Sequence, residues 1–191
     1  MIWLIAGLVI FFGVHSTRIF ADSWRTQCIT IKGENVWKGI YSLLSIAGLL
    51  LIIYGYGLSR ADPVFLWTPP SWTRHLASLL VLFAFILIAA AYIPGNHIKS
   101  RLGHPMYAGV KIWAFSHLIT NGRLGDVLLF GGFLVWAIVG FSSARRRDKK
   151  AATVYASGTA KGTATTFVAG FIAYGVFASY LHRVLIGVSP F

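Results

Sequence analysis

The sequence has little charge. Asp, Glu, Lys and Arg make up only 12% of its 191 residues, while hydrophobic residues make up 57%. An ordinary soluble domain carries about 25% charged residues. A chain this short of charge cannot cover a water-facing surface, so lipid must cover much of it. The composition excludes an ordinary soluble domain and predicts an all-α, polytopic membrane protein.

Cysteine and acidic residues are also scarce. Cys28 is the single cysteine, which excludes a disulfide framework and a paired-cysteine redox or zinc site. The five acidic residues fall near predicted helix ends or in loops: Asp22, Glu34, Asp62, Asp126 and Asp148. Because none falls deep within an apolar segment, we expect neither a carboxylate proton relay nor a carboxylate-rich di-metal site. The sequence also lacks an internal repeat, which argues against an inverted-repeat transporter.

Six apolar segments are present. A helix needs about 20 mostly apolar residues to cross a bilayer. The predicted spans are 2–20, 37–58, 74–93, 105–121, 124–142 and 167–186, forming one six-helix bundle over residues 1–191. Segment 105–121 is the weakest, because it is short and contains Lys111 and His117. Five spans with this segment re-entrant is the alternative topology.

The net charge of +12 is distributed unevenly over the predicted loops. Twelve basic residues follow the first, third and fifth spans: Arg18, Arg25, Lys32, Lys38, Lys99, Arg101, Arg145, Arg146, Arg147, Lys149, Lys150 and Lys161. Only four lie on the other side: Arg60, Arg74, Arg123 and Arg183. The positive-inside rule then predicts a multi-pass inner-membrane protein with both termini periplasmic. No nucleic acid partner is expected, and Met1–Val14 is interpreted as a retained helix, not a cleaved signal.

Residues 144–166 resemble a linker. The segment is basic at first and then rich in Gly, Ala and Thr, so we expect it to be flexible. Its basic part is interpreted as a topology anchor, with contact to anionic lipid as the alternative. The aromatic loop 66–72 is predicted to be a rigid cap at the headgroup level.

Histidine is the outstanding candidate for chemistry, because imidazole suits iron, copper or zinc. His15 lies in the first predicted span and His117 well inside the fourth. Two imidazoles that face each other across helices can hold a haem iron axially. Arg18, three residues after His15, would suit the haem propionates. The alternative is that each histidine simply hydrogen-bonds a backbone carbonyl or a polar neighbour.

Other residues are weaker candidates. His104 stands at the entrance of the fourth span with Lys111 on the same face, and is predicted either to receive an anion or propionate or merely to cap the helix. Asn121, one turn after His117, is predicted to contact the ligand or its surroundings. His182 is a reserve ligand on a small-residue stripe.

The remaining histidines and several small residues are predicted to have structural roles only. We expect His97 to be a solvated loop residue and His75 to lie at the membrane interface. Gly175 and Ala178 share the face of His182 and are predicted to pack closely against another helix. We expect the same of Gly131 and Gly132 in the fifth span.

Several of these residues lie in longer motifs. They are His15-Ser16-Thr17-Arg18, the run GHPMYAG at 103–109, the run WAFSHLITNG at 113–122 and Leu129-Phe130-Gly131. Together they resemble the NnrU family over nearly the whole chain. The resemblance implies a bacterial inner-membrane protein associated with denitrification and nitric oxide metabolism, with nitric oxide reductase components as possible partners.

The NnrU family is similar to the plant 15-cis-zeta-carotene isomerase, a haem b enzyme. Carried across by motif, the resemblance implies haem b ligated by His15 and His117. The plant enzyme has a cysteine three residues before its second histidine, where this chain has Ala114. Ligand switching to sulfur from that position is therefore not expected.

Three functions stay open at this level. The first is a haem b protein for nitric oxide handling or carotenoid-like isomerisation; as an enzyme it would be an isomerase or oxidoreductase. The second is a non-catalytic accessory or assembly protein for a nitric oxide reductase. The third is a membrane methyltransferase, whose entrance motif the HPMY run also resembles. Those enzymes carry acidic residues near a C-terminal helix, and this chain has none after Asp148.

Overall fold

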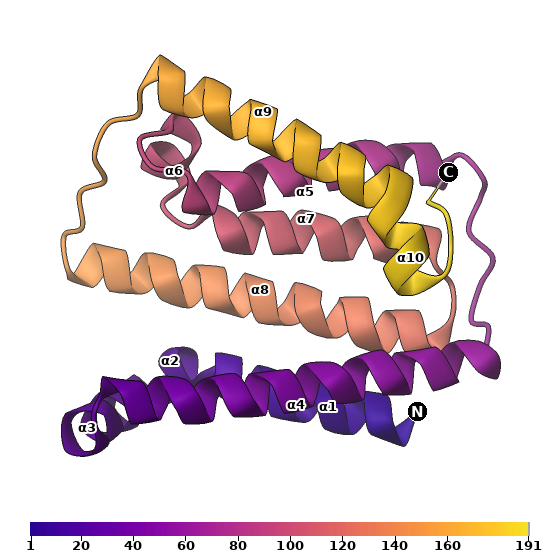
Figure 1. Cartoon of the computed structure of the whole chain (residues 1–191), viewed down its shortest axis with the longest axis horizontal. Helices are drawn as coiled ribbons and strands as arrows, with labels where there is room; N and C mark the ends of the chain where they lie inside the picture. Colours follow the sequence, from indigo (N-terminus) through magenta and orange to yellow (C-terminus); the bar gives the residue numbers. More distant parts are fainter. Residues whose placement is uncertain (191) are drawn as a thin grey trace. The chain divides into compact units, whose positions relative to one another are not determined.

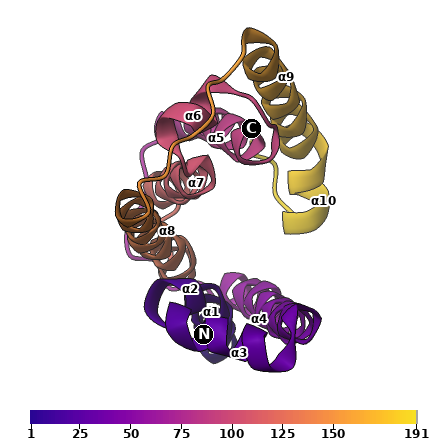
Figure 2. The same ribbon diagram turned by 90° about the vertical axis from the view of Figure 1, so that its left-hand side faces the viewer.

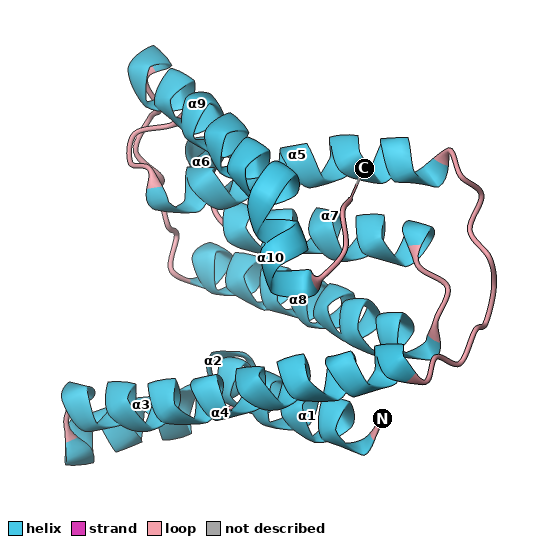
Figure 3. Ribbon diagram, turned by 45° about the vertical axis from the view of Figure 1, so that its right-hand side comes forward, coloured by secondary structure: helices cyan, strands magenta, loops and turns pink. Residues whose placement is uncertain are grey.

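The computed structural model describes residues Met1–Pro190, and helices joined by loops account for that range (Figure 3). The helices are α1 Ile2–His15, α2 Thr17–Phe20, α3 Asp22–Lys32, α4 Glu34–Ala61, α5 Thr73–Tyr92, α6 His97–Leu102, α7 Pro105–Thr120, α8 Leu124–Lys150, α9 Ala160–Val176, the π-helical turn η1 Phe177–Leu181 and α10 His182–Ile186. An isolated bridge between Phe65 and Arg123 is the one strand-like pairing in this range. The predicted all-α class is confirmed for the described residues.

Four helical segments are long and apolar enough to cross a membrane. They are α4, α5, α8 and the continuous stretch Ala160–Ile186. Large apolar side chains point outward from them; in α4, Leu43, Leu50 and Ile53 are 69%, 60% and 58% exposed. Exposed apolar surface of this extent is unfavourable in water and favourable in lipid. The structure therefore supports the predicted membrane protein.

The helices α1 and α7 are shorter than the spans 2–20 and 105–121 that were predicted for them. They contain 14 and 16 residues, or about 21 and 24 Å at ~1.5 Å per residue, against a hydrocarbon core of ~30 Å. The first predicted span is interrupted at Ser16, where the Thr17 hydroxyl donates to the Val14 carbonyl at 2.9 Å. Such side-chain bonds compete with the helical ladder. Four spanning helices are thus supported, and the count of six is not confirmed.

Two segments expected as loops are helical. Helix α3 lies beside the start of α4, where Trp24 meets Trp37 edge-on at 5.7 Å and the Arg25 guanidinium lies 5.9 Å from the Trp37 ring. Helix α6 begins after Asn96, whose side chain accepts the Lys99 amide hydrogen at 2.7 Å. Both helices are too polar or too short to qualify as spans, so a search for apolar runs passes over them.

The expected flexible linker at 144–166 is wrong for most of its length. Helix α8 continues to Lys150, and α9 begins at Ala160, so only residues 151–159 form a loop. The run from Ala144 to Lys150 is rich in Ala, Arg and Lys, which are good helix formers. Thr159 caps α9 by accepting the Gly162 amide hydrogen at 3.0 Å.

The described chain forms two compact units. Unit 1 comprises residues 1–67 and 122–132, and unit 2 comprises residues 68–121 and 133 onward. In unit 1, α1 and α4 lie side by side and antiparallel (Figures 1 and 2). Glycines bring the two backbones together: a Cβ on Gly7 would lie 2.6 Å from the Ile52 nitrogen, and one on Gly55 would overlap the Leu4 backbone. This is the small-residue packing that membrane helices use.

Replacing Gly55 by Val is expected to destabilise unit 1 by about 2–3 kcal/mol, because the new side chain would overlap backbone atoms that cannot move aside. Gly57→Val is the matched control, since a Cβ at Gly57 meets nothing within 4 Å. Thermal unfolding in detergent measures the difference. Equal melting temperatures for the two variants would contradict the packing described.

In unit 2, α5 packs against both α7 and α9 (Figures 1 and 2). Close approach again depends on glycine: a Cβ on Gly109 would lie 2.9 Å from the Ala84 oxygen, and one on Gly170 would lie 2.7 Å from the Ile86 Cα. The hydroxyls of Ser78 and Tyr174 join α5 to α9 at 2.5 Å. The contact at Gly109 holds α7, which carries the predicted ligand His117, against α5.

The prediction that Gly131, Gly132 and Gly175 pack closely against another helix is only partly correct. Gly132 is close to another helix, since a Cβ there would lie 2.9 Å from the Phe12 ring. Gly131 and Gly175 are not, because a Cβ at either position would meet nothing within 4 Å. Periodicity alone does not show which side of a membrane helix faces lipid and which faces protein.

Candidate functional site

His15 is the last residue of α1 and lies in unit 1, where it is partly buried. Its Nδ1 lies 2.8 Å from the carbonyl oxygen of Phe11, one helical turn earlier. The imidazole stacks on the Phe11 ring with centroids 4.0 Å apart and lies 5.2 Å from the Tyr41 ring. The ring is thus held in one orientation by a hydrogen bond and by aromatic contacts.

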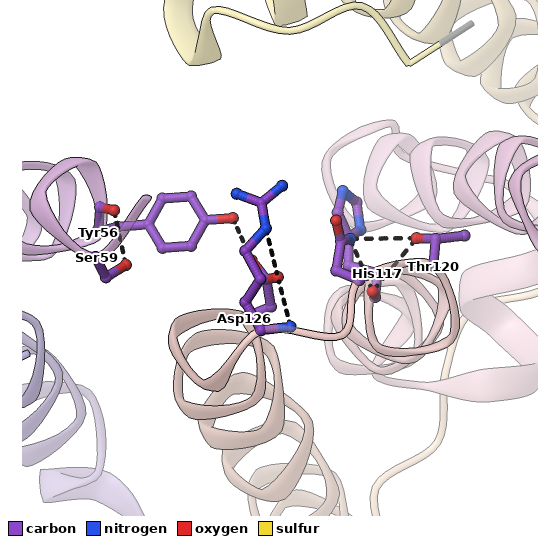
Figure 4. A network of polar contacts seen from close by, with 7 residues as sticks. Tyr56, Ser59, His117, Thr120 and Asp126 are labelled. Carbon is purple, nitrogen blue, oxygen red and sulfur yellow. Dashed lines mark hydrogen bonds and ion pairs between the residues drawn. The ribbon is translucent and has the colours of Figure 1, made fainter. Parts of the chain in front are cut away.

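His117 lies in the last turn of α7 and belongs to unit 2 (Figure 4). Its Nδ1 lies 2.8 Å from the Trp113 carbonyl oxygen, and its ring lies 5.2 Å from the Trp113 ring. The Asn121 side chain donates to the His117 carbonyl oxygen at 2.8 Å. Asn121 therefore ends α7 and fixes the backbone that carries the imidazole.

The two histidines share one local geometry. A carbonyl oxygen can only accept a hydrogen bond, so Nδ1 carries the proton in both rings. The lone pair then resides on Nε2, which is the tautomer that a metal-ligating histidine uses when the other ring nitrogen donates to a backbone carbonyl. The donor chemistry of both residues fits an axial ligand of haem iron. Residues 1–190 contain no group of three or more His, Cys, Asp or Glu side chains placed to hold a metal ion.

Two other predicted residues lie close in sequence to these histidines. Arg18 lies in α2, three residues after His15 and across the break at Ser16. His182 lies at the start of α10, directly after the π-helical turn, and its Nδ1 donates to the Val188 carbonyl oxygen at 2.7 Å. It therefore has the same tautomer as the other two and stays the reserve candidate.

His104 has different chemistry. Its Nε2 donates to Oδ2 of Asp148 at 2.8 Å. The Tyr155 hydroxyl donates to the same Oδ2 at 2.8 Å and lies 3.2 Å from His104 Nε2. The anion that His104 binds is thus the carboxylate of Asp148, in the same chain. Lys111, predicted to act with His104, instead lies 4.0 Å from the centre of the Phe141 ring.

Tyr155 holds the loop 151–159 against the entrance of α7. Its ring contacts the backbone of Gly103, whose φ of 73° and lack of a side chain make room for it. Partial burial, and next the hydrogen bond to Asp148, raise the pKa of the Tyr155 hydroxyl to about 12. Sequence reasoning gave no role to Tyr155, because its partners are 7 and 51 positions away.

Tyr155→Phe is expected to lower stability by about 1 kcal/mol near neutral pH, because Asp148 loses a hydrogen bond. The folded-state pKa is raised, so this stabilisation is complete below the ordinary tyrosine value of 10 and declines as pH rises toward 12. Melting temperatures of the two proteins should therefore converge between pH 10 and pH 12. A difference that grew over this interval would show that Tyr155 is not held protonated by Asp148.

The prediction that His97 is a solvated loop residue is wrong. His97 begins α6, and both its backbone nitrogen and its Nδ1 contact the Thr163 hydroxyl, at 3.0 and 2.8 Å. It therefore joins the α6 turn to α9 and is only partly exposed. His75 is exposed in the first turn of α5, and its place at the membrane interface stays a prediction.

A buried carboxylate in unit 1 was missed from the sequence. Asp126 in the first turn of α8 is only 1% exposed. Tyr56 donates its hydroxyl to Asp126 Oδ1 at 2.6 Å (Figure 4), and the Arg123 backbone amide donates to Oδ2 at 3.2 Å. The Arg123 guanidinium lies 3.8 Å from the same oxygen. The short spacing of Arg123 and Asp126 was visible in the sequence, but Tyr56 lies 70 positions away.

The loops beside Asp126 are fixed by backbone hydrogen bonds within unit 1. The Leu66 amide donates to the Gly122 oxygen at 2.7 Å, and the Leu124 amide donates to the Val64 oxygen at 2.9 Å. Gly122 leaves no room for a side chain, because a Cβ would overlap the Trp67 carbonyl. The start of the aromatic loop is therefore tied to the start of α8.

Comparison with known proteins identifies a family. No match was found among curated proteins or among solved structures. The family model described as NnrU protein matches residues 3–190, which is nearly the whole chain. This match extends over both units and includes His15, His104 and His117, and the chain belongs to the NnrU family.

Proposed function

We propose that the protein is a haem b-binding membrane protein that serves nitric oxide metabolism, and that His15 and His117 are the residues that would hold the haem iron. The observation that carries the proposal is the shared tautomer: each ring donates Nδ1–H to a backbone carbonyl at 2.8 Å and keeps its lone pair on Nε2. The proposal rests on the local geometry of each histidine within its own unit. Membership of the NnrU family supports the link to nitric oxide.

The surrounding residues would hold the imidazoles and exclude water. Phe11, Tyr41 and Trp113 contact the two rings through aromatic faces and edges, and Asn121 fixes the backbone of His117. Bound haem would supply an iron able to transfer an electron, or to bind nitric oxide in place of one of the two imidazoles. Arg18 remains a candidate partner for a propionate because arginine recognises carboxylates well. His104 would have to exchange Asp148 for a propionate to play that part.

We further propose that α1 and α7 also cross or enter the bilayer, which completes six helices in a bacterial inner membrane with both termini periplasmic. The charge asymmetry of the loops supports this topology. Cysteine labelling with a membrane-impermeant reagent tests it, after Cys28→Ser and introduction of single cysteines at residues 63 and 153. Labelling in intact cells at the first position and not at the second is expected, and the reverse would contradict the orientation.

The haem content of the purified full-length chain tests the proposed cofactor. Cells supplied with a haem precursor should yield about one haem b per chain, measured after extraction as the pyridine complex. Absence of haem, unchanged after incubation with haemin, would overturn the proposal. The alternative proposed for this chain, a non-catalytic accessory or assembly protein of nitric oxide reductase, would then be tested by partner capture in mild detergent.

A further inference from the structure

The end of α8 and the loop after it enclose an open cavity within unit 2. Its volume is about 500 Å³. Four basic side chains line it, with one carboxylate and one phenol: Arg101, Arg145, Arg146, Lys149, Asp148 and Tyr155. Three separate segments contribute, namely α6, α8 and the loop 151–159. The cavity is thus a product of the fold and not of one charged run.

The single carboxylate does not neutralise these cations. Asp148 Oδ2 already accepts hydrogen bonds from Tyr155 and from His104, each at 2.8 Å. Among the ion pairs of the described residues, none joins Arg101, Arg145, Arg146 or Lys149 to an acidic side chain. The cavity therefore carries excess positive charge and is suited to an anion.

The turn that shapes the cavity is held in a defined conformation. Ala152, which lines it, has a positive φ of 49°, and the Thr153 amide donates to the Asp148 carbonyl oxygen at 2.9 Å. This turn directs the chain from α8 back toward Gly103, where the Tyr155 ring packs on the backbone. The loop that closes one side of the cavity is therefore fixed, and the four basic residues lie on the helices α6 and α8.

The position of the cavity along α8 indicates where its ligand comes from. The apolar part of α8 ends near residue 142, and Arg145 to Lys149 follow three to seven residues later. At ~1.5 Å per residue this is about 5–10 Å beyond the hydrocarbon, within or just beyond the headgroup layer of roughly 5–8 Å. A lipid phosphate lies at that depth, and arginine pairs with phosphate through two parallel hydrogen bonds.

We propose that this cavity binds the phosphate headgroup of an anionic phospholipid, through Arg145 and Arg146 of α8 and Arg101 of α6. Lys149 adds charge without a second donor pair of fixed geometry. Tyr155 and His104 keep the Asp148 carboxylate turned to them and so leave the arginines to the lipid. The proposal does not depend on haem binding.

Titration of the full-length protein in uncharged detergent tests this site. The probes are phosphatidylglycerol and phosphatidylcholine, each with a fluorescent acyl chain. The double variant Arg145→Gln/Arg146→Gln should bind phosphatidylglycerol about 25-fold more weakly, since each basic residue contributes about fivefold near anionic lipid. Phosphatidylcholine binding should not change. Both arginines are exposed, so the fold should tolerate the substitutions.

Lys32→Gln/Lys38→Gln is the matched control, because it removes two charges from exposed positions in unit 1. Its affinity for phosphatidylglycerol should stay within about twofold of the unsubstituted protein, since each lysine is outside the cavity. An equal loss in both double variants would overturn the proposal in favour of diffuse attraction. Displacement of the lipid by millimolar inorganic phosphate would also overturn it, because the site would then serve a soluble phosphate.

Discussion

The His117→Ala variant is expected to lose the spectrum of a six-coordinate, low-spin haem, and His15→Ala is expected to do the same. Each substitution removes an imidazole that is held in one orientation by a hydrogen bond from Nδ1–H to a backbone carbonyl, and alanine has no atom that can ligate iron. Absorption spectra of the ferric and ferrous proteins measure the loss. Added imidazole should restore the low-spin spectrum, because it can occupy the space that the alanine leaves.

His75→Ala is the control for both variants. His75 is exposed at the start of α5 and has no part in the proposed ligation. Its variant should keep the haem spectrum of the unsubstituted protein. Should His15→Ala or His117→Ala retain a full low-spin spectrum, that histidine is not an axial ligand, and His182 becomes the next candidate because its tautomer is the same.

Asp126→Ala is expected to destabilise the protein by about 3 kcal/mol. The substitution leaves the partly buried Tyr56 hydroxyl without its acceptor and removes the carboxylate that faces Arg123. Loss of one member of a buried charged cluster typically costs about 3–5 kcal/mol, and the partial exposure of Arg123 places this case at the lower end. Tyr56→Phe should cost about 1–2 kcal/mol, because it removes one hydrogen bond to a charged group.

Thermal unfolding in detergent measures both effects, with Asp62→Ala as the matched control. Asp62 is exposed just beyond the end of α4 and has no ion pair among those of the described residues. Its variant should melt within about 1 °C of the unsubstituted protein. If Asp126→Ala and Asp62→Ala had the same melting temperature, the cluster of Tyr56, Arg123 and Asp126 would not stabilise unit 1.

The predicted and observed helices agree best where a helix is formed by one continuous apolar segment. Helices α4, α5 and α8 begin within three residues of the predicted spans, because a continuous apolar segment can satisfy its backbone in lipid only as a helix. The prediction was wrong where polar residues decide. Ser16 interrupts the first span, and α3 forms from a sequence too polar to be recognised as a span.

Contacts between residues far apart in the chain are the part of the candidate sites that the sequence does not predict. His15 and His117 were predicted as ligands because a histidine within an apolar segment is unusual, and this assignment stays a prediction. Asn121 was placed beside His117 because the two are one helical turn apart, and the structure joins them. The pairs Tyr56–Asp126 and His104–Asp148 connect positions 70 and 44 residues apart, and no periodicity predicts which helices meet.

The absorption spectrum of the purified full-length protein, oxidised and then reduced with dithionite, tests the central claim most directly. A stoichiometric Soret band and a sharp reduced α-band are expected, because two imidazoles would hold the iron. A featureless spectrum that added haemin does not change would contradict the claim. The Nδ1–carbonyl hydrogen bonds of His15 and His117 would then be structural bonds of two helix ends.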